Sequence, residues 1–318
     1  MLSSQIPYVV RRLVWLLLAA GCRPAASGNR PDPLQRVSPI EVGPVIPFTT
    51  SALAEVSGTV GDPGSPSRFW MINDGGNPAD LIAVDAAGNI ERQVRLRGAK
   101  NIDWEDLALG PCGTATCFYV ADIGDNNARR AFVTVYRALL TPAGADAIDA
   151  ERLDLLWPDG PDDVEAATVD STGTLWFVTK GRAGGAQHVM EVPSEAWDRS
   201  GCSDTIATPC RQGPFTARRR QTLSVPVRST QDWITGAALS TDGRYMALRT
   251  YNDVLILPRA VDGTLIEAAG IRCDLKDVQR QGEALAWLTG GRLLLTTESS
   301  PRHRANQRLV RCPMPALR

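Results

Sequence analysis

Carboxylates recur at two positions of a repeated strand, turn and strand pattern, and this spacing is the first sign of chemistry in the sequence. At the start of the first strand of each copy stand Glu55, Glu105, Glu165, Thr235 and Glu283. At the end of the second strand stand Asp74, Asp122, Lys180, Arg249 and Glu298. In an up-and-down strand pair these two ends lie on the same side. We therefore expect both sets, together with Asp106 beside Glu105, to surround one opening and to bind a ligand there.

Carboxylates that converge on one opening repel one another unless a cation or a basic side chain neutralises them. A hard, oxygen-ligated ion such as calcium is therefore the expected cofactor. Its predicted ligands are Glu105, Asp122, Asp125 and Glu165, of which Asp125 belongs to an oxygen-rich GDNN loop. Lys180 and Arg249 either pair with these acids or hold an anionic group of a ligand beside the metal.

The strands that must position these residues belong to five copies of one repeat. Equivalent first positions lie 50, 60, 70 and 48 residues apart, so a constant core carries loops of variable length. Each copy contains four short strands separated by turn residues. Radial repetition of four-stranded sheets predicts an all-β, five-bladed β-propeller. A strand at 40–47 is expected to close the last blade, and six blades are the alternative if the segment 195–220 holds a degenerate one.

An architectural role explains the glutamates equally well at this stage. A carboxylate at the start of an inner strand can accept backbone N–H groups from the adjoining blade. Repeats preserve such architectural residues as readily as functional ones. The sequence leaves both interpretations open.

The N-terminus has the pattern of an export signal. Arg11 and Arg12 precede an apolar run at 13–20 that is too short to span a bilayer, and Gly21 and Cys22 follow. The string LAAGC resembles the lipobox of bacterial lipoproteins, although alanine stands where that motif favours leucine. The resemblance implies a signal peptide at 1–21 and a lipidated tether at 22–39, which would hold the protein in the cell envelope on the periplasmic or outer-surface side. The repeat predicts one propeller domain at 40–318. Plain secretion is the alternative.

Without Cys22 the chain keeps an even number of cysteines, which in an oxidising compartment indicates disulfides. Cys112 and Cys117 flank a turn between predicted paired strands, and Cys202 and Cys210 bracket a polar loop. Cys273 and Cys312 would pair by elimination. The formal net charge of −1 gives no electrostatic reason to bind nucleic acid. We expect a monomer whose partner is a protein, a glycan or a small ligand.

Two inner-strand segments, EALAWLTGGRLLLTTE and VEAATVDSTGTLWFVTK, resemble the glutamate-led units of secreted bacterial propellers of the phytase-like and gluconolactonase-like kind. The resemblance covers Ile40 to Cys312 and implies the fold, but no single activity. Two functions follow as hypotheses. The favoured one is an envelope-anchored binding scaffold; the alternative is a calcium-dependent hydrolase of phosphoesters or lactones, in which Lys180 or Arg249 steadies developing negative charge.

Overall fold

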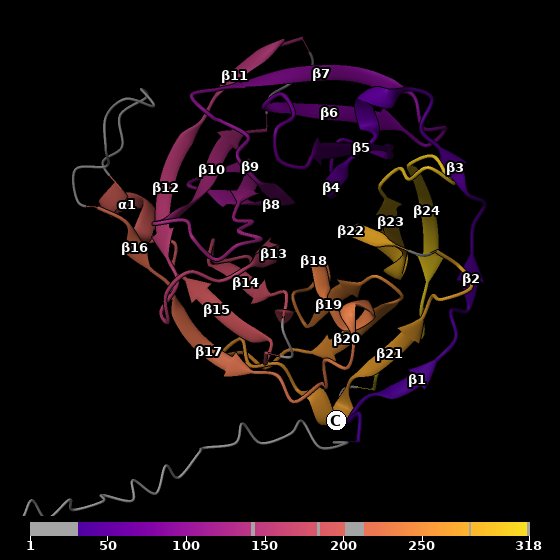
Figure 1. Cartoon of the computed structure of the whole chain (residues 1–318). Coiled ribbons are helices and arrows are strands. Elements are labelled where there is room, and N and C mark those ends of the chain that lie inside the picture. The colour runs from indigo at the N-terminus through magenta and orange to yellow at the C-terminus, as the bar shows by residue number, and fades with distance from the viewer. Residues whose placement is uncertain (1–30, 141–143, 183–184, 201–212, 280, 317–318) are drawn as a thin grey trace, which may run out of the picture. The chain divides into compact units, whose positions relative to one another are not determined.

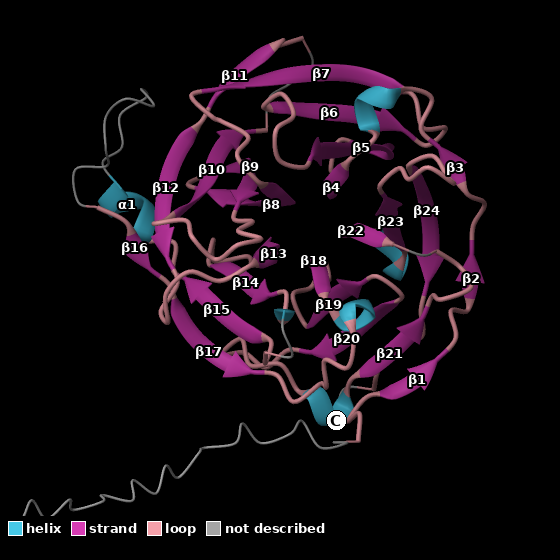
Figure 2. Ribbon diagram, in the orientation of Figure 1, coloured by secondary structure: helices cyan, strands magenta, loops and turns pink. Residues whose placement is uncertain are grey.

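Five sheets arranged around a central axis make up the described part of the chain (Figure 1). This computed structural model describes residues 31–140, 144–182, 185–200, 213–279 and 281–316. Helices in these ranges are short, and strands dominate (Figure 2). None of the described helices is long and apolar enough to cross a bilayer. The all-β, five-bladed propeller predicted from the repeat is confirmed.

Each blade is a meander in which successive strands lie farther from the axis (Figure 1). The innermost strands are β4 (Val56–Asp62), β8 (Trp104–Cys112), β13 (Val164–Val169), β18 (Ile234–Leu239) and β22 (Gly282–Trp287). The second strands are β5 (Ser65–Asn73), β9 (Ala115–Asp122), β14 (Leu175–Thr179), β19 (Tyr245–Thr250) and β23 (Leu293–Thr297). The third strands are β6 (Asp80–Asp85), β10 (Val133–Leu139), β15 (His188–Val192), β20 (Asp253–Pro258) and β24 (Asn306–Arg311).

The fourth strands are β7 (Ile90–Arg97), β12 (Glu151–Leu156), β17 (Arg218–Thr222), β21 (Ile271–Asp274) and, in the fifth blade, the pair β2 (Glu41–Val42) and β3 (Ile46–Pro47). Both β2 and β3 pair antiparallel with β24, which confirms that an N-terminal strand closes the last blade. The segment 195–220 supplies the short helix α1 (Ala196–Ser200), the strand β16 (Phe215–Thr216) and most of β17. Its described residues therefore add to existing blades and form no sixth one.

Three blades carry a fifth strand on their outer edge. These strands are β1 (Gln35–Val37) on β21, β11 (Ala147–Asp149) on β7 and β16 (Phe215–Thr216) on β12, and all three pairings are parallel. A covered edge cannot pair with another chain, so these additions protect the rim of the ring. The strand β1 also lies inside the segment 22–39 that we expected to be a tether.

The hydrophobic core is divided into five clusters, each shared by two neighbouring blades. Central strands are therefore buried on both faces, and every residue of β13 and β14 is buried. Trp70 packs edge-on against Phe118 of the next blade, with ring centroids 5.2 Å apart. Burial of apolar surface between neighbouring blades therefore stabilises their contact around the ring.

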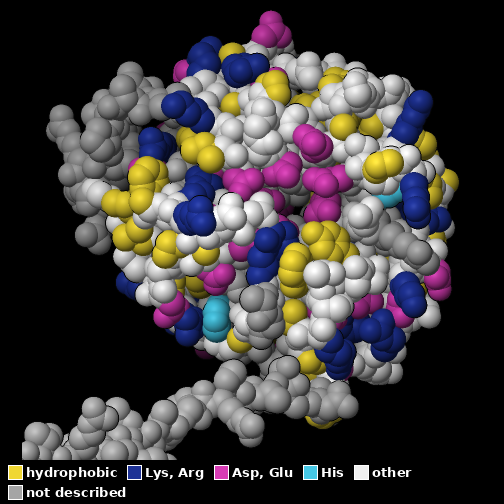
Figure 3. Space-filling view, viewed as in Figure 1, with side chains coloured by type: hydrophobic (Ala, Val, Ile, Leu, Met, Phe, Trp, Pro, Cys, Tyr) yellow, Lys and Arg dark blue, Asp and Glu magenta, His cyan; other side chains and the backbone are white. Residues whose placement is uncertain are grey.

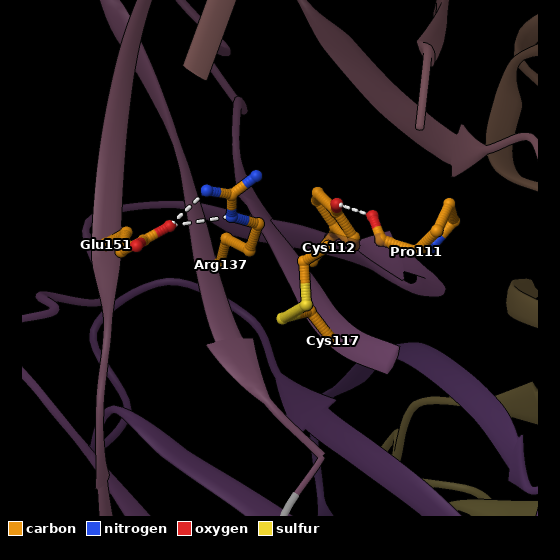
Figure 4. Close-up of a disulfide and its surroundings, with 6 residues drawn as sticks. Pro111, Cys112, Cys117, Arg137 and Glu151 are labelled. Carbon is orange, nitrogen blue, oxygen red and sulfur yellow. Dashed lines mark hydrogen bonds and ion pairs between the residues drawn. A yellow bond between two sulfur atoms is a disulfide. The ribbon is translucent and has the colours of Figure 1, made fainter. Parts of the chain in front are cut away.

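Two of the three predicted disulfides are present. Cys112–Cys117 links β8 to β9 beside the ion pair of Arg137 and Glu151 (Figure 4). Cys273–Cys312 joins β21 to the residue after β24, and so links the fourth blade to the fifth. The predicted pair Cys202 and Cys210, and the lipidation residue Cys22, lie outside the described residues.

At the axis, one buried carboxylate connects three blades. Asp106 in β8 is fully buried, and its Oδ1 accepts the backbone N–H of Leu107 at 2.9 Å. Its Oδ2 accepts the N–H of Ala167 in β13 at 2.9 Å and that of Ala237 in β18 at 3.0 Å. Burial raises the pKa of Asp106 well above its ordinary value, and the three N–H donors act against that rise. Asp106 thus occupies the interior of the channel.

Replacing Asp106 with asparagine should destabilise the fold by about 2 to 4 kcal/mol. Either orientation of the amide places an NH₂ group against at least one buried N–H donor, which then has no acceptor. The free energy of unfolding in denaturant measures the loss. The matched control is Asp149→Asn, because Asp149 is a largely exposed carboxylate on the outer rim. Equal stability of the two variants would contradict a bridging role for Asp106.

Candidate functional site: the mouth of the axial channel

An extra residue interrupts the pairing of every innermost strand near its start, and this bulge decides which side chains face the opening. The bulged positions are Ser57, Glu105, Glu165, Thr235 and, in the last blade, Glu283 with Ala284. Ser57 is therefore the structural equivalent of the repeated glutamates, whereas the sequence repeat suggests Glu55. Glu55 lies two residues earlier, is exposed, and accepts a hydrogen bond from Asn77 at 2.8 Å.

The two hydroxyl residues at the bulge have an architectural role. Ser57 donates to the carbonyl oxygen of Trp104 at 2.8 Å, and Thr235 donates to the carbonyls of Gly282 and Glu283 at 2.9 Å each. Each bond ties an innermost strand to the following blade. An ionised carboxylate cannot donate in this way. No described backbone N–H donates to the carboxylates of Glu105, Glu165 and Glu283, so the architectural interpretation does not account for these three.

The strand register also corrects the second predicted ring. The residues that follow the second strands at equivalent positions are Asp74, Ile123, Lys180, Tyr251 and Glu298. Asp122 lies one residue before the equivalent position in the second blade, which Ile123 occupies. Its buried carboxylate accepts the N–H of Asp103 at 3.1 Å and pairs with Arg130 at 2.8 Å, which braces the loop after β9.

Arg249 lies two residues before the equivalent position in the fourth blade, which Tyr251 occupies, and is buried between the fourth and fifth blades. A Cβ atom on Gly282 would come within 1.8 Å of its Nη2 atom, so only glycine leaves room for the guanidinium. Burial lowers the pKa of Arg249 to about 10, although the nearby Glu283 acts to raise it. Arg249 is therefore a structural cation below the rim.

Three carboxylates meet at the mouth. Asp74, Asp103 and Glu105 each place an oxygen within 4.8 Å of the other two, and Glu105 is buried while the other two are partly exposed. None of the three has a basic side chain within ion-pair distance among the described residues. Asp103 was missing from the predicted site. Asp103 lies two residues before the bulged Glu105, just ahead of the same strand, and this spacing could have identified it.

Two glycines allow these carboxylates to approach. A Cβ atom on Gly124 would lie 2.1 Å from Oε1 of Glu105 and 2.6 Å from Cγ of Asp103. A Cβ atom on Gly75 would lie 2.8 Å from Oδ1 of Asp103. The acidic triad thus packs against the backbone of Gly75 and Gly124. A side chain at either position would occupy the space of the carboxylates.

Crowding of buried acids changes their acidity. Burial first, and the neighbouring Asp74 second, raise the pKa of Asp103 to about 6. The same two causes raise the pKa of Glu298 to about 7. The pKa values of the carboxyls of Glu105 and Glu283 also lie well above their ordinary range, with burial again the main cause. These carboxyl groups therefore resist ionisation in the absence of a cation, and a bound cation would favour their ionised form.

The other side of the mouth is cationic and aromatic. Lys180 forms an ion pair with Glu165 and lies 4.0 Å from Asp163, which also binds Arg182. The Trp233 ring faces both cations, at 5.4 Å from Nζ of Lys180 and 5.0 Å from Cζ of Arg182. Acidic side chains surround the central hollow of this face, with basic groups beside them (Figure 3). The mouth thus combines an unpaired acidic half with a paired half.

The predicted metal ligands are distributed over both halves. Glu105 belongs to the triad, whereas Glu165 pairs with Lys180. Asp122 pairs with Arg130, and Asp125 accepts the backbone N–H of Arg130 at 2.7 Å. A cation at the triad would therefore be held by Glu105 with Asp74 and Asp103. The oxygen donors, their charge and their spacing suit a hard divalent ion.

Without a bound cation, lowering the pH from about 7.5 to about 5.5 should stabilise the fold. Asp103 and Glu298 have raised pKa values in the native state, so in this window the native protein binds more protons than the unfolded chain, and stability falls as the pH rises. Thermal unfolding in chelator measures the slope. The double variant Asp103→Asn, Glu298→Gln should flatten it, whereas Asp149→Asn should leave it unchanged; an unchanged slope in the double variant would refute the assignment.

No protein-family model matches the sequence, and no curated protein is significantly similar to it. Solved structures that resemble the chain include regucalcin, a calcium-binding protein of Agrobacterium tumefaciens, with 13% identity, 89% and 98% coverage of the two chains and a TM-score of 0.42. A gluconolactonase of Xanthomonas campestris has 14% identity, 82% and 73% coverage and a TM-score of 0.44. A luciferin-regenerating enzyme has 9% identity, 86% and 98% coverage and a TM-score of 0.45. At these identities the similarity concerns the fold alone.

Proposed function

We propose that this protein is a binding propeller whose channel mouth holds a calcium ion and uses it to capture a ligand. One observation carries the proposal: Asp74, Asp103 and Glu105 converge without a basic partner. Three such groups would be mutually destabilising unless a cation joined them. Calcium accepts six to eight oxygen ligands in flexible geometry, so three carboxylates leave positions for water and for a ligand.

The cationic half of the mouth indicates what the ligand contributes. Lys180 interacts electrostatically with Asp74 and Glu105 of the triad, and the Trp233 ring offers a planar surface beside Lys180 and Arg182. An anionic or hydroxyl-rich group that bridges calcium and these cations fits this arrangement. A small ligand, a glycan or an acidic segment of a protein could carry such a group.

A second candidate is a calcium-dependent hydrolase of phosphoesters or lactones. It is favoured by the position of Glu298, whose pKa of about 7 suits a general base, on the same rim as the triad. In that case the ion would polarise the substrate, and Lys180 would stabilise the negative charge that develops.

Calcium should raise the melting temperature of the purified protein by several degrees, saturably, because an ion that binds only the native state stabilises it by mass action. Asp103→Asn and Glu105→Gln should each abolish the rise. Gly124→Ala should raise the calcium concentration needed for half of this rise at least tenfold. The new methyl group displaces both carboxylates, although every ligand residue remains.

The matched control is Glu151→Gln, which removes an exposed carboxylate that pairs with Arg137 far out on the second blade. It should keep the full calcium response. A wild-type protein that shows no shift at millimolar calcium would overturn the metal site. Turnover of a lactone or phosphoester by the calcium-loaded protein, lost in Glu298→Gln with calcium binding intact, would decide for the hydrolase over the scaffold.

We also propose that the protein is anchored in the cell envelope by lipid on Cys22. The described chain begins nine residues later, and Asp32 is bound there by the buried Arg272 at 2.9 Å, so the tether would be short. Expression in a bacterial host with a tagged fatty acid should label the protein and drive it into the detergent phase. Cys22→Ser should lose both properties; labelling that persists in this variant would exclude Cys22 as the acceptor.

A further inference from the structure

The axial channel has a second chamber at the end opposite the mouth. It is a cavity of about 550 Å³, lined by the innermost strands of all five blades and by the hairpin turns that follow these strands in four of them. Asp106 lies between the two chambers, since its carboxylate joins β8, β13 and β18 across the axis. A volume of this size is within the range of about 300–1,000 Å³ that small-molecule sites occupy.

Backbone donors face the inner end of this cavity. The N–H groups of Leu107, Ala167 and Ala237 point to the axis, because all three reach Asp106. Thr59 and Leu285 occupy the same register position in the first and fifth blades, and both line the cavity. By this equivalence their N–H groups also point to the axis, but Asp106 does not accept them. Thr59 and Leu285 are themselves fully buried, so neither residue offers an exposed donor to a ligand in the cavity.

Apolar side chains form the middle of the wall. Two positions farther along each innermost strand stand Gly61, Leu109, Val169, Leu239 and Trp287, and all five line the cavity. Leu109, Leu239 and Trp287 are only partly buried, so apolar surface remains uncovered inside the channel. An apolar ligand would bury it, at roughly 25 cal/mol for each Å² removed from water.

The outer rim holds one cation without a partner. Asp62 and Asp170 line the rim, but Asp62 accepts from Arg68 and the Trp70 indole, and Asp170 pairs with Arg259 at 2.7 Å. Asp242 pairs with Arg244 in the same way at 2.7 Å.

Arg292 also lines the cavity and is partly exposed. Its guanidinium has no hydrogen bond or ion pair to any described residue. The charge left to recruit a ligand is therefore positive.

From these features we infer that the far chamber binds a small amphipathic monocarboxylate. Its carboxylate pairs with Arg292 at the rim, and its apolar chain lies against Leu109, Leu239 and Trp287. This site is independent of the proposed calcium site, because Asp106 separates the two chambers.

Octanoate is the probe, with octanol as its uncharged counterpart of equal chain length. Ligand-observed NMR titration of the full protein in chelator should show saturable binding of octanoate and at least fivefold weaker binding of octanol. Arg292→Gln should weaken octanoate at least fivefold and leave octanol unchanged. Leu239→Trp and Leu109→Trp, which fill the cavity from two blades, should weaken both probes.

Two variants are controls. Lys100→Gln removes an exposed cation that does not line the cavity and pairs with no described carboxylate, and Asp103→Asn alters the mouth. Both should bind octanoate as the wild type does. Absence of saturable binding, or binding that survives both Arg292→Gln and Leu239→Trp, would overturn the proposal. Neither result bears on calcium at the mouth, which is absent throughout.

Discussion

The propeller depends on one buried interaction at its axis, where the carboxylate of Asp106 accepts backbone N–H groups from three blades. Innermost strands have a free edge, and the polar groups of that edge must be satisfied although water is scarce there. Apolar clusters between blades hold the ring sideways, but they cannot fix how far each blade stands from the axis. A single acceptor shared by three strands does so, and it also divides the channel into two chambers.

That division gives the two ends of the channel different chemistry. At the mouth, Asp74, Asp103 and Glu105 come together over two glycines without an ion pair to a described basic residue. At the far end the aspartates are already paired, and the unpaired charge belongs to Arg292. The mouth thus suits a hard cation, whereas the far chamber suits an apolar molecule with one negative group.

The bulges explain why acidic residues are tolerated at the mouth at all. A regular strand would turn alternate side chains toward opposite neighbouring blades, where an unpaired glutamate would be buried among apolar residues. The extra residue in each innermost strand redirects one side chain toward the axis. In the first and fourth blades this side chain is a hydroxyl that ties two blades together. In the other three it is a carboxylate: Glu165 pairs with Lys180, whereas Glu105 belongs to the acidic triad.

The sequence alone determined the repeat, the number of blades, the closure by an N-terminal strand and the disulfides Cys112–Cys117 and Cys273–Cys312, because strand periodicity, turn residues and cysteine spacing are local signals. The membership of the site was decided only by the tertiary structure. Strand pairing places Ser57, and not Glu55, at the bulge of the first blade, and the folded loops bring Asp103 and Asp74 beside Glu105. Whether an acid is free also depends on distant cations: Arg130 neutralises Asp122 and Lys180 neutralises Glu165, and such pairings form only when blades pack against one another.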